Sequence, residues 1–233
     1  MFNPAPGDRA LVVAPHPDDE SLGLAGTIAK LTGHGVRVDV LAVALTSGPM
    51  HGGHSDATTR TREFTDACDV LGVKARTIAW VDDPRAANPA AHLPDLVQLI
   101  EAGPVASLAT SRPHVLFLPA ADAHHQDHQA VHAAGLAAAR PALARHRHVP
   151  WTVLGYDGPE DRAYLAPKTT RPLIVDTSSH WPAKRKALEC YATQLRLAPH
   201  PRSLEKIHAQ DEAAGAAIGT GLAERFAIYR MAA

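Results

Sequence analysis

Residues 10–20 read Ala-Leu-Val-Val-Ala-Pro-His-Pro-Asp-Asp-Glu, so that an apolar run is followed at once by a histidine and three acids. A short apolar run of this kind is typical of a buried strand in a parallel sheet. The residues after such a strand lie at its carboxyl end, which is where open α/β sheets bind their ligands. Carboxylates crowded together there repel one another unless a cation lies among them. The stretch therefore predicts an α/β fold with a site for a divalent metal at the edge of its sheet.

The bulk properties of the chain are those of an ordinary globular protein. It has 233 residues, 45% of them hydrophobic and 20% charged, and we expect one domain spanning residues 1–233. A net charge of −1 without a dense Lys/Arg run argues against nucleic acid or an anionic membrane as a partner. Cys68 and Cys190 lack metal-ligand spacing, so we expect two free thiols.

Two further expectations concern location and assembly. No stretch approaches the roughly 20 apolar residues that span a bilayer. The first residues also lack a basic segment followed by a long apolar one, so we expect a cytoplasmic protein. The oligomeric state stays open, with a homo-oligomer among the options.

Apolar periodicity predicts alternating strands and helices. Strands are expected at residues 9–14, 36–45, 74–81, 115–119, 151–156 and 173–176, and helices at residues 21–34, 58–71, 95–108, 127–140, 182–195 and 204–223. This alternation favours a mostly parallel sheet with helices on both faces, which is a Rossmann-like three-layer sandwich. The polar loops at residues 46–57, 82–94 and 141–150 are expected to shape the pocket.

A dinucleotide-binding domain has the same alternation of elements, but its first turn differs. Such a domain needs glycines after the first strand so that the backbone can approach a pyrophosphate. Here that turn is made by residues 16–20, whose carboxylates repel phosphate, and Gly23 and Gly26 come too late in the expected helix. The sequence therefore disfavours a dinucleotide site.

A second polar group, His-His-Gln-Asp-His at residues 124–128, follows the expected strand 115–119. In a parallel sheet this group lies at the same edge as His16. Histidine and carboxylate ligands with an open position for water are typical of a catalytic zinc site. His16, either Asp18 or Asp19, and one histidine of the second group would make three ligands, which leaves other residues for proton transfer. Helix capping is the simpler explanation for Asp18 or Asp19, but it accounts neither for His16 nor for the second acid.

Motifs in two parts of the chain match one known family. The first is the apolar strand followed by His-Pro-Asp-Asp-Glu at residues 16–20, and the second is His-Gln-Asp-His at residues 125–128. Arg60 and Glu63, spaced as Arg-x-x-Glu, fit a helix of the same pattern between them. In these motifs the chain resembles the LmbE-like or PIG-L family of zinc-dependent de-N-acetylases, whose members remove acetyl from N-acetylglucosamine-type groups.

The resemblance implies a metal site and selects among its candidate ligands. His16, Asp19 and His128 would bind the ion, so the choice between Asp18 and Asp19 is made by the resemblance. Zn²⁺ is the metal expected, and another divalent metal such as Fe²⁺ is the alternative.

The resemblance also implies roles for the residues around that ion. Asp18 would be the general base, and His125 the acid that also stabilises the oxyanion. Asp127 would hydrogen-bond the other nitrogen of His125, and Arg60 would contact substrate hydroxyls. Chemistry assigns no role to Glu20, and we expect it to tie the turn to the backbone or to Arg60.

Together these observations predict a metal-dependent hydrolase that removes an N-acetyl group from an amino-sugar-containing small molecule. An amidase acting on a larger sugar–thiol conjugate is an alternative, as is a catalytically silent metal-binding module of the same fold. Asp82 and Asp83 stand where the family has an Asp-Gly pair that contacts the sugar, and Cys190 stands where it often has histidine. These departures concern the substrate more than the reaction.

Overall fold

The computed structural model describes residues 3–50, 53–143, 145–163 and 170–232. Its centre is a sheet with the strand order β5-β2-β1-β6-β7-β9-β8. The strands are β1 (Arg9–Ala14), β2 (Arg37–Leu45), β5 (Ala75–Val81), β6 (Val115–Pro119), β7 (Thr152–Tyr156), β8 (Leu173–Asp176) and β9 (Ala223–Met231). Pairing is parallel from β5 to β7, whereas β9 is antiparallel to both of its neighbours. The mostly parallel sheet confirms the expected α/β fold.

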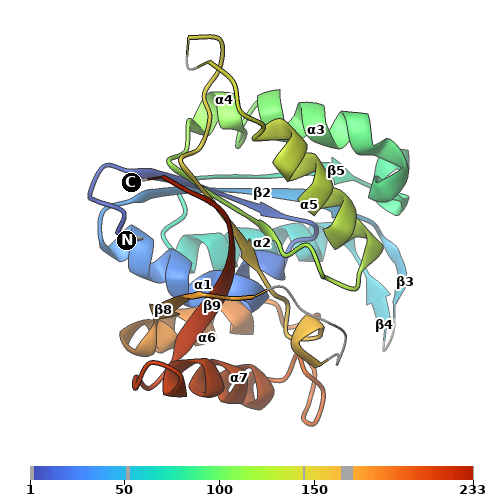
Figure 1. The fold of residues 1–233 in the computed structure, drawn as a ribbon. Coiled ribbons are helices and arrows are strands. Elements are labelled where there is room, and N and C mark those ends of the chain that lie inside the picture. The colour runs from blue at the N-terminus through green and yellow to red at the C-terminus, as the bar shows by residue number, and fades with distance from the viewer. Residues whose placement is uncertain (1–2, 51–52, 144, 164–169, 233) are drawn as a thin grey trace.

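Helices cover both faces of this sheet and complete a three-layer sandwich, as Figure 1 shows. One layer contains α1 (Asp19–Gly33), α2 (Ala57–Val70), α6 (Trp181–Cys190) and α7 (Leu204–Ala216). The other contains α3 (Leu93–Ala102), α4 (Leu108–Ser111) and α5 (Gln126–Ala138). None of the helices in the described part of the chain is long and apolar enough to cross a membrane.

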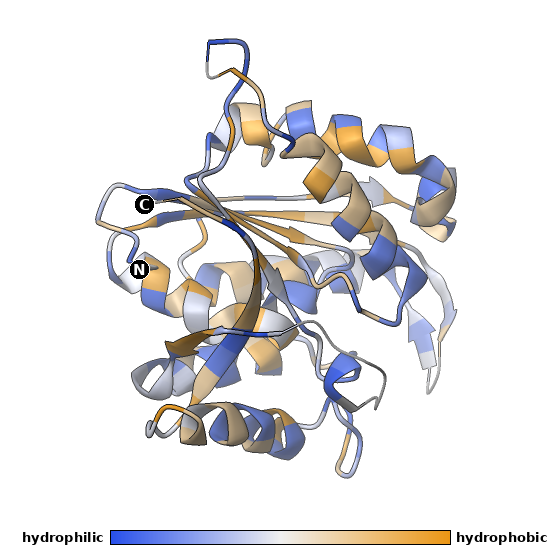
Figure 2. Cartoon of the chain, viewed as in Figure 1, coloured by the Kyte–Doolittle hydropathy of each residue, from blue (hydrophilic) through white to orange (hydrophobic). Residues whose placement is uncertain are grey.

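Strand β1 explains why the opening run is apolar at every position. Side chains alternate between the two faces of a strand. Ala10 and Val12 pack in the core beneath α1 and α2, while Leu11 and Val13 pack beneath α3 and α5, and all four are fully buried. The apolar strands at the centre of Figure 2 lie between these two cores. A strand covered on both faces has no solvent side to favour polar residues.

Gly23 and Gly26 serve packing between α1 and the C-terminal half of the sheet. A Cβ atom on Gly23 would lie 2.4 Å from the ring of Tyr156, and one on Gly26 would lie 2.8 Å from Thr177. Both glycines lie inside α1 rather than in the turn before it. They therefore allow a close helix–sheet approach, and the turn itself contains no glycine.

The C-terminal region differs most from the prediction. The helix expected at residues 204–223 ends at Ala216, and residues 223–231 form β9, which periodicity did not reveal. The chain turns at Gly219, whose φ of +72° is a conformation that favours glycine. Glu224 and Arg225 then interrupt the apolar pattern at the start of β9. The predicted C-terminal end of this helix was therefore wrong.

Three of the expected elements differ from the structure over a few residues. The helix expected at residues 95–108 ends at Ala102, because Gly103 and Pro104 break it, and the short helix α4 begins only at Leu108. The helix expected at residues 182–195 ends at Cys190. The loop at residues 46–57 contains a small antiparallel pair, β3 (Gly48–Met50) and β4 (Gly53–Ser55). Cys68 and Cys190 are free thiols, as expected.

Candidate metal centre

The sheet topology brings the two polar motifs together. Strands β1 and β6 are parallel neighbours, so their carboxyl ends lie side by side. His16 follows β1, and the turn after β6 leads into α5, which carries His128. Ligand atoms of His16, Asp19 and His128 all lie within 4.8 Å of one another. The residues that the family resemblance assigned to a metal thus lie in one cluster.

The donor set of this cluster fits a divalent metal. Asp19 Oδ2 lies 3.3 Å from His16 Nδ1 and 3.3 Å from His128 Nε2. Imidazole nitrogens and a carboxylate oxygen are the usual protein ligands of zinc. Asp19 and His128 are buried, whereas the His16 side chain is partly exposed, so the cluster is reachable from solvent.

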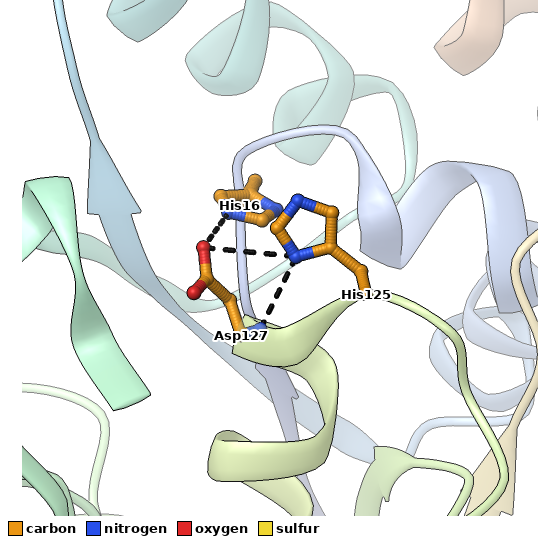
Figure 3. A group of neighbouring side chains, drawn as sticks. All are labelled: His16, His125 and Asp127. Carbon is orange, nitrogen blue, oxygen red and sulfur yellow. Dashed lines mark hydrogen bonds and ion pairs between the residues drawn. The ribbon is translucent and has the colours of Figure 1, made fainter. Parts of the chain in front are cut away.

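Asp127 contacts the His16 ring, as Figure 3 shows. Its Oδ2 atom lies 3.0 Å from His16 Nε2, while His16 Nδ1 faces Asp19. A histidine that binds a metal commonly uses its other ring nitrogen to bond a carboxylate. The arrangement therefore has the form of a ligand histidine held by a second carboxylate. The other Asp127 oxygen, Oδ1, is buried and has no hydrogen-bond partner among the described residues.

The carboxylates favour a positive charge at His16. Burial lowers the pKa of His16, but hydrogen bonds to Asp127 and Asp19 outweigh burial and raise that pKa to about 10. Burial disfavours the charged form of Asp19 too and so acts to raise its pKa. His128 and His16 nevertheless hold that pKa well below its usual value. Asp19 is therefore ionised at neutral pH, as a ligand carboxylate must be.

Asp18 occupies the N-cap position of α1 without acting as a cap. Its side chain makes no capping hydrogen bond, so capping does not explain this residue. The carboxylate is buried and lies 3.0 Å from Arg202 Nη1 and 3.6 Å from Arg60 Nη2. Burial raises the pKa of Asp18, an effect that the Arg202 guanidinium opposes.

Glu20 supports the turn that carries Asp18. The Asp18 backbone has a φ of 141°, a value that residues with a side chain rarely adopt. Glu20 Oε2 accepts from the Asp18 N–H at 3.1 Å, and Oε1 accepts from Tyr191 Oη at 2.6 Å and Ser21 Oγ at 2.7 Å. Of the two partners expected for Glu20, the backbone is present and Arg60 is not, because Arg60 contacts Pro17, Asp18 and Glu63. Burial raises the pKa of Glu20 to about 7.

His125 lies at the start of α5 and faces solvent on one side. Its Nδ1 atom accepts from the Asp127 backbone N–H at 3.2 Å, so a neutral ring carries its proton on Nε2. Asp127 Oδ2 is 3.7 Å from this Nδ1 atom, which is an ion-pair separation rather than a hydrogen bond. Burial and the neighbouring His16 lower the pKa of His125. The Asp127 carboxylate therefore hydrogen-bonds His16, whereas Asp127 hydrogen-bonds His125 through its backbone N–H.

A cavity of about 440 Å³ adjoins the cluster. Its lining includes His16, Asp18, Arg60, Arg202 and residues 44–50. The loop at residues 46–57 thus contributes to the cavity as expected. The described residues of the loop at 141–150, which are all but residue 144, do not line it, because this loop leads into the amino end of β7, at the opposite edge of the sheet.

The loop at residues 82–94 supports the cavity without lining it. Asp82 accepts hydrogen bonds from the Ser47 N–H at 2.6 Å and from Ser47 Oγ at 2.9 Å. Asp83 pairs with Arg85 at 2.8 Å. Neither acid is among the residues that line the cavity.

Arg202 lines the cavity, and the sequence analysis did not identify it as a site residue. A single arginine in a loop belongs to no motif or periodic pattern that would mark it.

Comparison with known proteins adds independent evidence. The model of the PIG-L family, described as GlcNAc-PI de-N-acetylase, matches residues 11–139. The chain belongs to the PIG-L family. It is also 30% identical over 236 residues to 1D-myo-inositol 2-acetamido-2-deoxy-alpha-D-glucopyranoside deacetylase from Mycobacterium sp. (strain JLS). That match covers 84% of this chain and 77% of the relative.

Solved structures show that this PIG-L chain shares its fold with proteins of low sequence identity. The conserved protein TT1542 from Thermus thermophilus aligns with a TM-score of 0.75 and 23% identity, over 96% of each chain. The A40926 pseudoaglycone deacetylase Dbv21 aligns with a TM-score of 0.72 and 24% identity, over 97% of this chain and 98% of that one. At such identities the likeness concerns the fold alone.

Proposed function

We propose that this PIG-L protein is a metal-dependent deacetylase that removes an N-acetyl group from an amino-sugar-containing small molecule. The observation that carries the proposal is the convergence of His16, Asp19 and His128 beside Asp18, at the edge of a cavity. The Mycobacterium relative is named for an acetamido-glucopyranoside substrate, which supports the class of substrate.

His16, Asp19 and His128 would hold the metal, which we propose to be Zn²⁺, with Fe²⁺ as the alternative. When bound, such an ion supplies a Lewis acid that polarises the amide carbonyl and lowers the pKa of water. Asp127 would fix the orientation of His16 through the 3.0 Å contact between Oδ2 and Nε2.

Asp18 would act as the general base. Its carboxylate lines the cavity next to the ligand cluster and can accept a proton from an attacking water. Arg202 and Arg60 supply positive charge beside it, which favours the ionised carboxylate that a base requires.

His125 would act as the acid. Because its Nδ1 atom accepts from the Asp127 N–H, the proton on Nε2 is available to a developing oxyanion. An amine leaves an amide only after it gains a proton, and His125 would donate that proton to the sugar nitrogen as an imidazolium. That cation requires a second proton on Nδ1 in place of the Asp127 N–H contact, and the Asp127 carboxylate 3.7 Å away would stabilise it. Arg60 lines the cavity and would contact substrate hydroxyls.

The test is release of acetate by the purified protein from a panel of N-acetylated amino sugars and their conjugates. A chelator should abolish the release, and added Zn²⁺ should restore it. Release that persists in a metal-free sample would refute the metal-dependent mechanism. Activity confined to large sugar–thiol conjugates would favour the amidase alternative, and bound metal without turnover on any substrate would favour the silent module.

A further inference from the structure

Two arginines contact the same oxygen of Asp18. Arg202 Nη1 lies 3.0 Å from Oδ2, and Arg60 Nη2 lies 3.6 Å from that oxygen. Within the described ranges, no hydrogen bond or ion pair reaches the other oxygen, Oδ1. The carboxylate thus has one oxygen held and one oxygen left to accept a proton.

Arg202 lies closer to Asp18 than Arg60 does, and among the described residues its guanidinium contacts fewer other groups. Arg60 also donates to the Pro17 carbonyl and lies 3.7 Å from Glu63, so its charge is divided among several groups. Among the described residues, the Arg202 side chain bonds only to Asp18, through Nη1, and to Glu160, through Nε. The shortest contact to the Asp18 carboxylate therefore comes from Arg202.

Contacts hold both the backbone and the guanidinium group of Arg202 in place. Its backbone N–H donates to His200 Nδ1 at 3.1 Å. The next residue, Ser203, caps α7 by accepting from the Lys206 N–H at 3.2 Å. Glu160, which follows β7, holds the guanidinium from the other side. The contact to Asp18 thus joins three segments that are distant in the sequence.

The Asp18 carboxylate needs such support. Its backbone has a φ of 141°, and no capping bond restrains its side chain. A base that is misplaced by about 1 Å can lose a hundredfold in rate. Arginine suits the task because its planar fork can contact two carboxylates at once, whereas lysine offers a single point charge.

We propose that Arg202 is a positioning residue for Asp18: it holds Oδ2 so that Oδ1 accepts the proton, and Glu160 holds Arg202 in turn. The inference rests on the proposed function, in which Asp18 is the base. Because Arg202 also lines the cavity, the competing role is direct substrate binding. The two roles differ in which kinetic constant they change.

The test compares R202A, R202K and E160Q with the wild-type protein, all loaded with zinc. We expect R202A to lower kcat by about 10- to 100-fold with KM nearly unchanged. R202K should keep part of the kcat that R202A loses, and added guanidinium ions should partly restore the kcat of R202A. E160Q should lower kcat less, and the R202A/E160Q double variant should resemble R202A alone because both act through one contact.

Controls distinguish an effect on the position of Asp18 from damage to the fold or to the metal site. Zinc content per chain and the melting temperature of R202A should match those of the wild type. R185A is the matched arginine deletion, since Arg185 is exposed and pairs only with Glu189 among the described residues, and it should keep full activity. Should R202A fail to fold, R202K and E160Q provide the same kinetic comparison.

Several results would overturn the inference. A raised KM with an unchanged kcat in R202A would show substrate binding, and loss of zinc would show a role in the metal site. An unaffected R202A beside an active wild type would refute this inference alone. A wild type that holds zinc but releases no acetate would refute the proposed function and the inference with it.

Discussion

Asp127 Oδ2 lies 3.0 Å from His16 Nε2 and so joins the turn after β1 to the first turn of α5. The contact holds the imidazole so that its other nitrogen faces Asp19. One carboxylate on α5 therefore orients a candidate ligand from a different part of the chain. This relationship leads to the first prediction.

Asp127→Asn should weaken zinc binding about 10- to 100-fold, because the ligand histidine loses its charged partner. Competition with a chromophoric chelator measures the change. Asp122→Asn, also a change of an acid near β6, is the matched control and should leave zinc affinity unaltered. Equal zinc affinity in Asp127→Asn and the wild type would remove Asp127 from the metal site.

Asp18→Asn should keep the metal and lose most turnover, by about 10²- to 10⁴-fold, because an amide cannot accept the proton from water. Metal analysis and acetate release on the same sample measure both properties. If Asp18→Asn loses its zinc, the assignment of Asp19 rather than Asp18 as the ligand is wrong.

The stability of the metal-free protein should fall as pH rises from about 4.5 to 7, owing to Glu20. Burial raises the pKa of Glu20 from 4.5 to about 7, so the folded state binds its proton more tightly than the unfolded state. The stabilisation is complete below pH 4.5 and is lost as pH approaches the folded-state pKa.

Glu20→Gln should flatten that part of the pH profile, since a glutamine cannot ionise. Urea unfolding at about pH 5 and about pH 7 measures the difference. Glu189→Gln, at an exposed position on α6, is the matched control and should keep the wild-type slope. A Glu20→Gln profile as steep as that of the wild type would contradict the assignment to Glu20.

Lys184→Met should destabilise the fold by about 3–5 kcal/mol, because it removes the nearest cation from two buried carboxylates. Lys184 Nζ lies 2.6 Å from Asp211 Oδ2 and 2.8 Å from Glu224 Oε1, and all three side chains are at most 1% exposed. Burial acts to lower the pKa of Lys184, but the two carboxylates raise that pKa above its usual value. Denaturant unfolding measures the loss, and Arg185→Met at the neighbouring exposed position should cost far less. A change within about 1 kcal/mol would mean that the carboxylates are satisfied without Lys184.

Much of the candidate site was predictable because its residues are close in sequence at the ends of two strands. His16 and Asp19 belong to one short motif, and Asp127 and His128 to another. An unbroken apolar run, such as that of β1, indicates a parallel strand that is buried on both faces. The cluster of candidate ligands follows once two such strands are neighbours in the sheet, whereas the choice of Asp19 over Asp18 came from the family resemblance.

The unpredicted parts depend on contacts between distant segments. The strand character of β9 is hidden because Glu224 is a buried charge, satisfied by Lys184 and by the N–H groups of Gly26 and Thr27. Arg202 reaches Asp18 only because the start of α7 lies near the start of α1. Neither fact leaves a periodic pattern in the local sequence.

The position of β9 has a consequence for how the protein is made. β9 follows every other described strand along the chain, yet it is inserted between β7 and β8 rather than added at an edge. While a ribosome is still translating, β7 has an open side and β8 has no partner until residues 223–231 emerge. The sheet can therefore close only after β9 has emerged, and a chain truncated before β9 would expose two unpaired strand edges that favour aggregation.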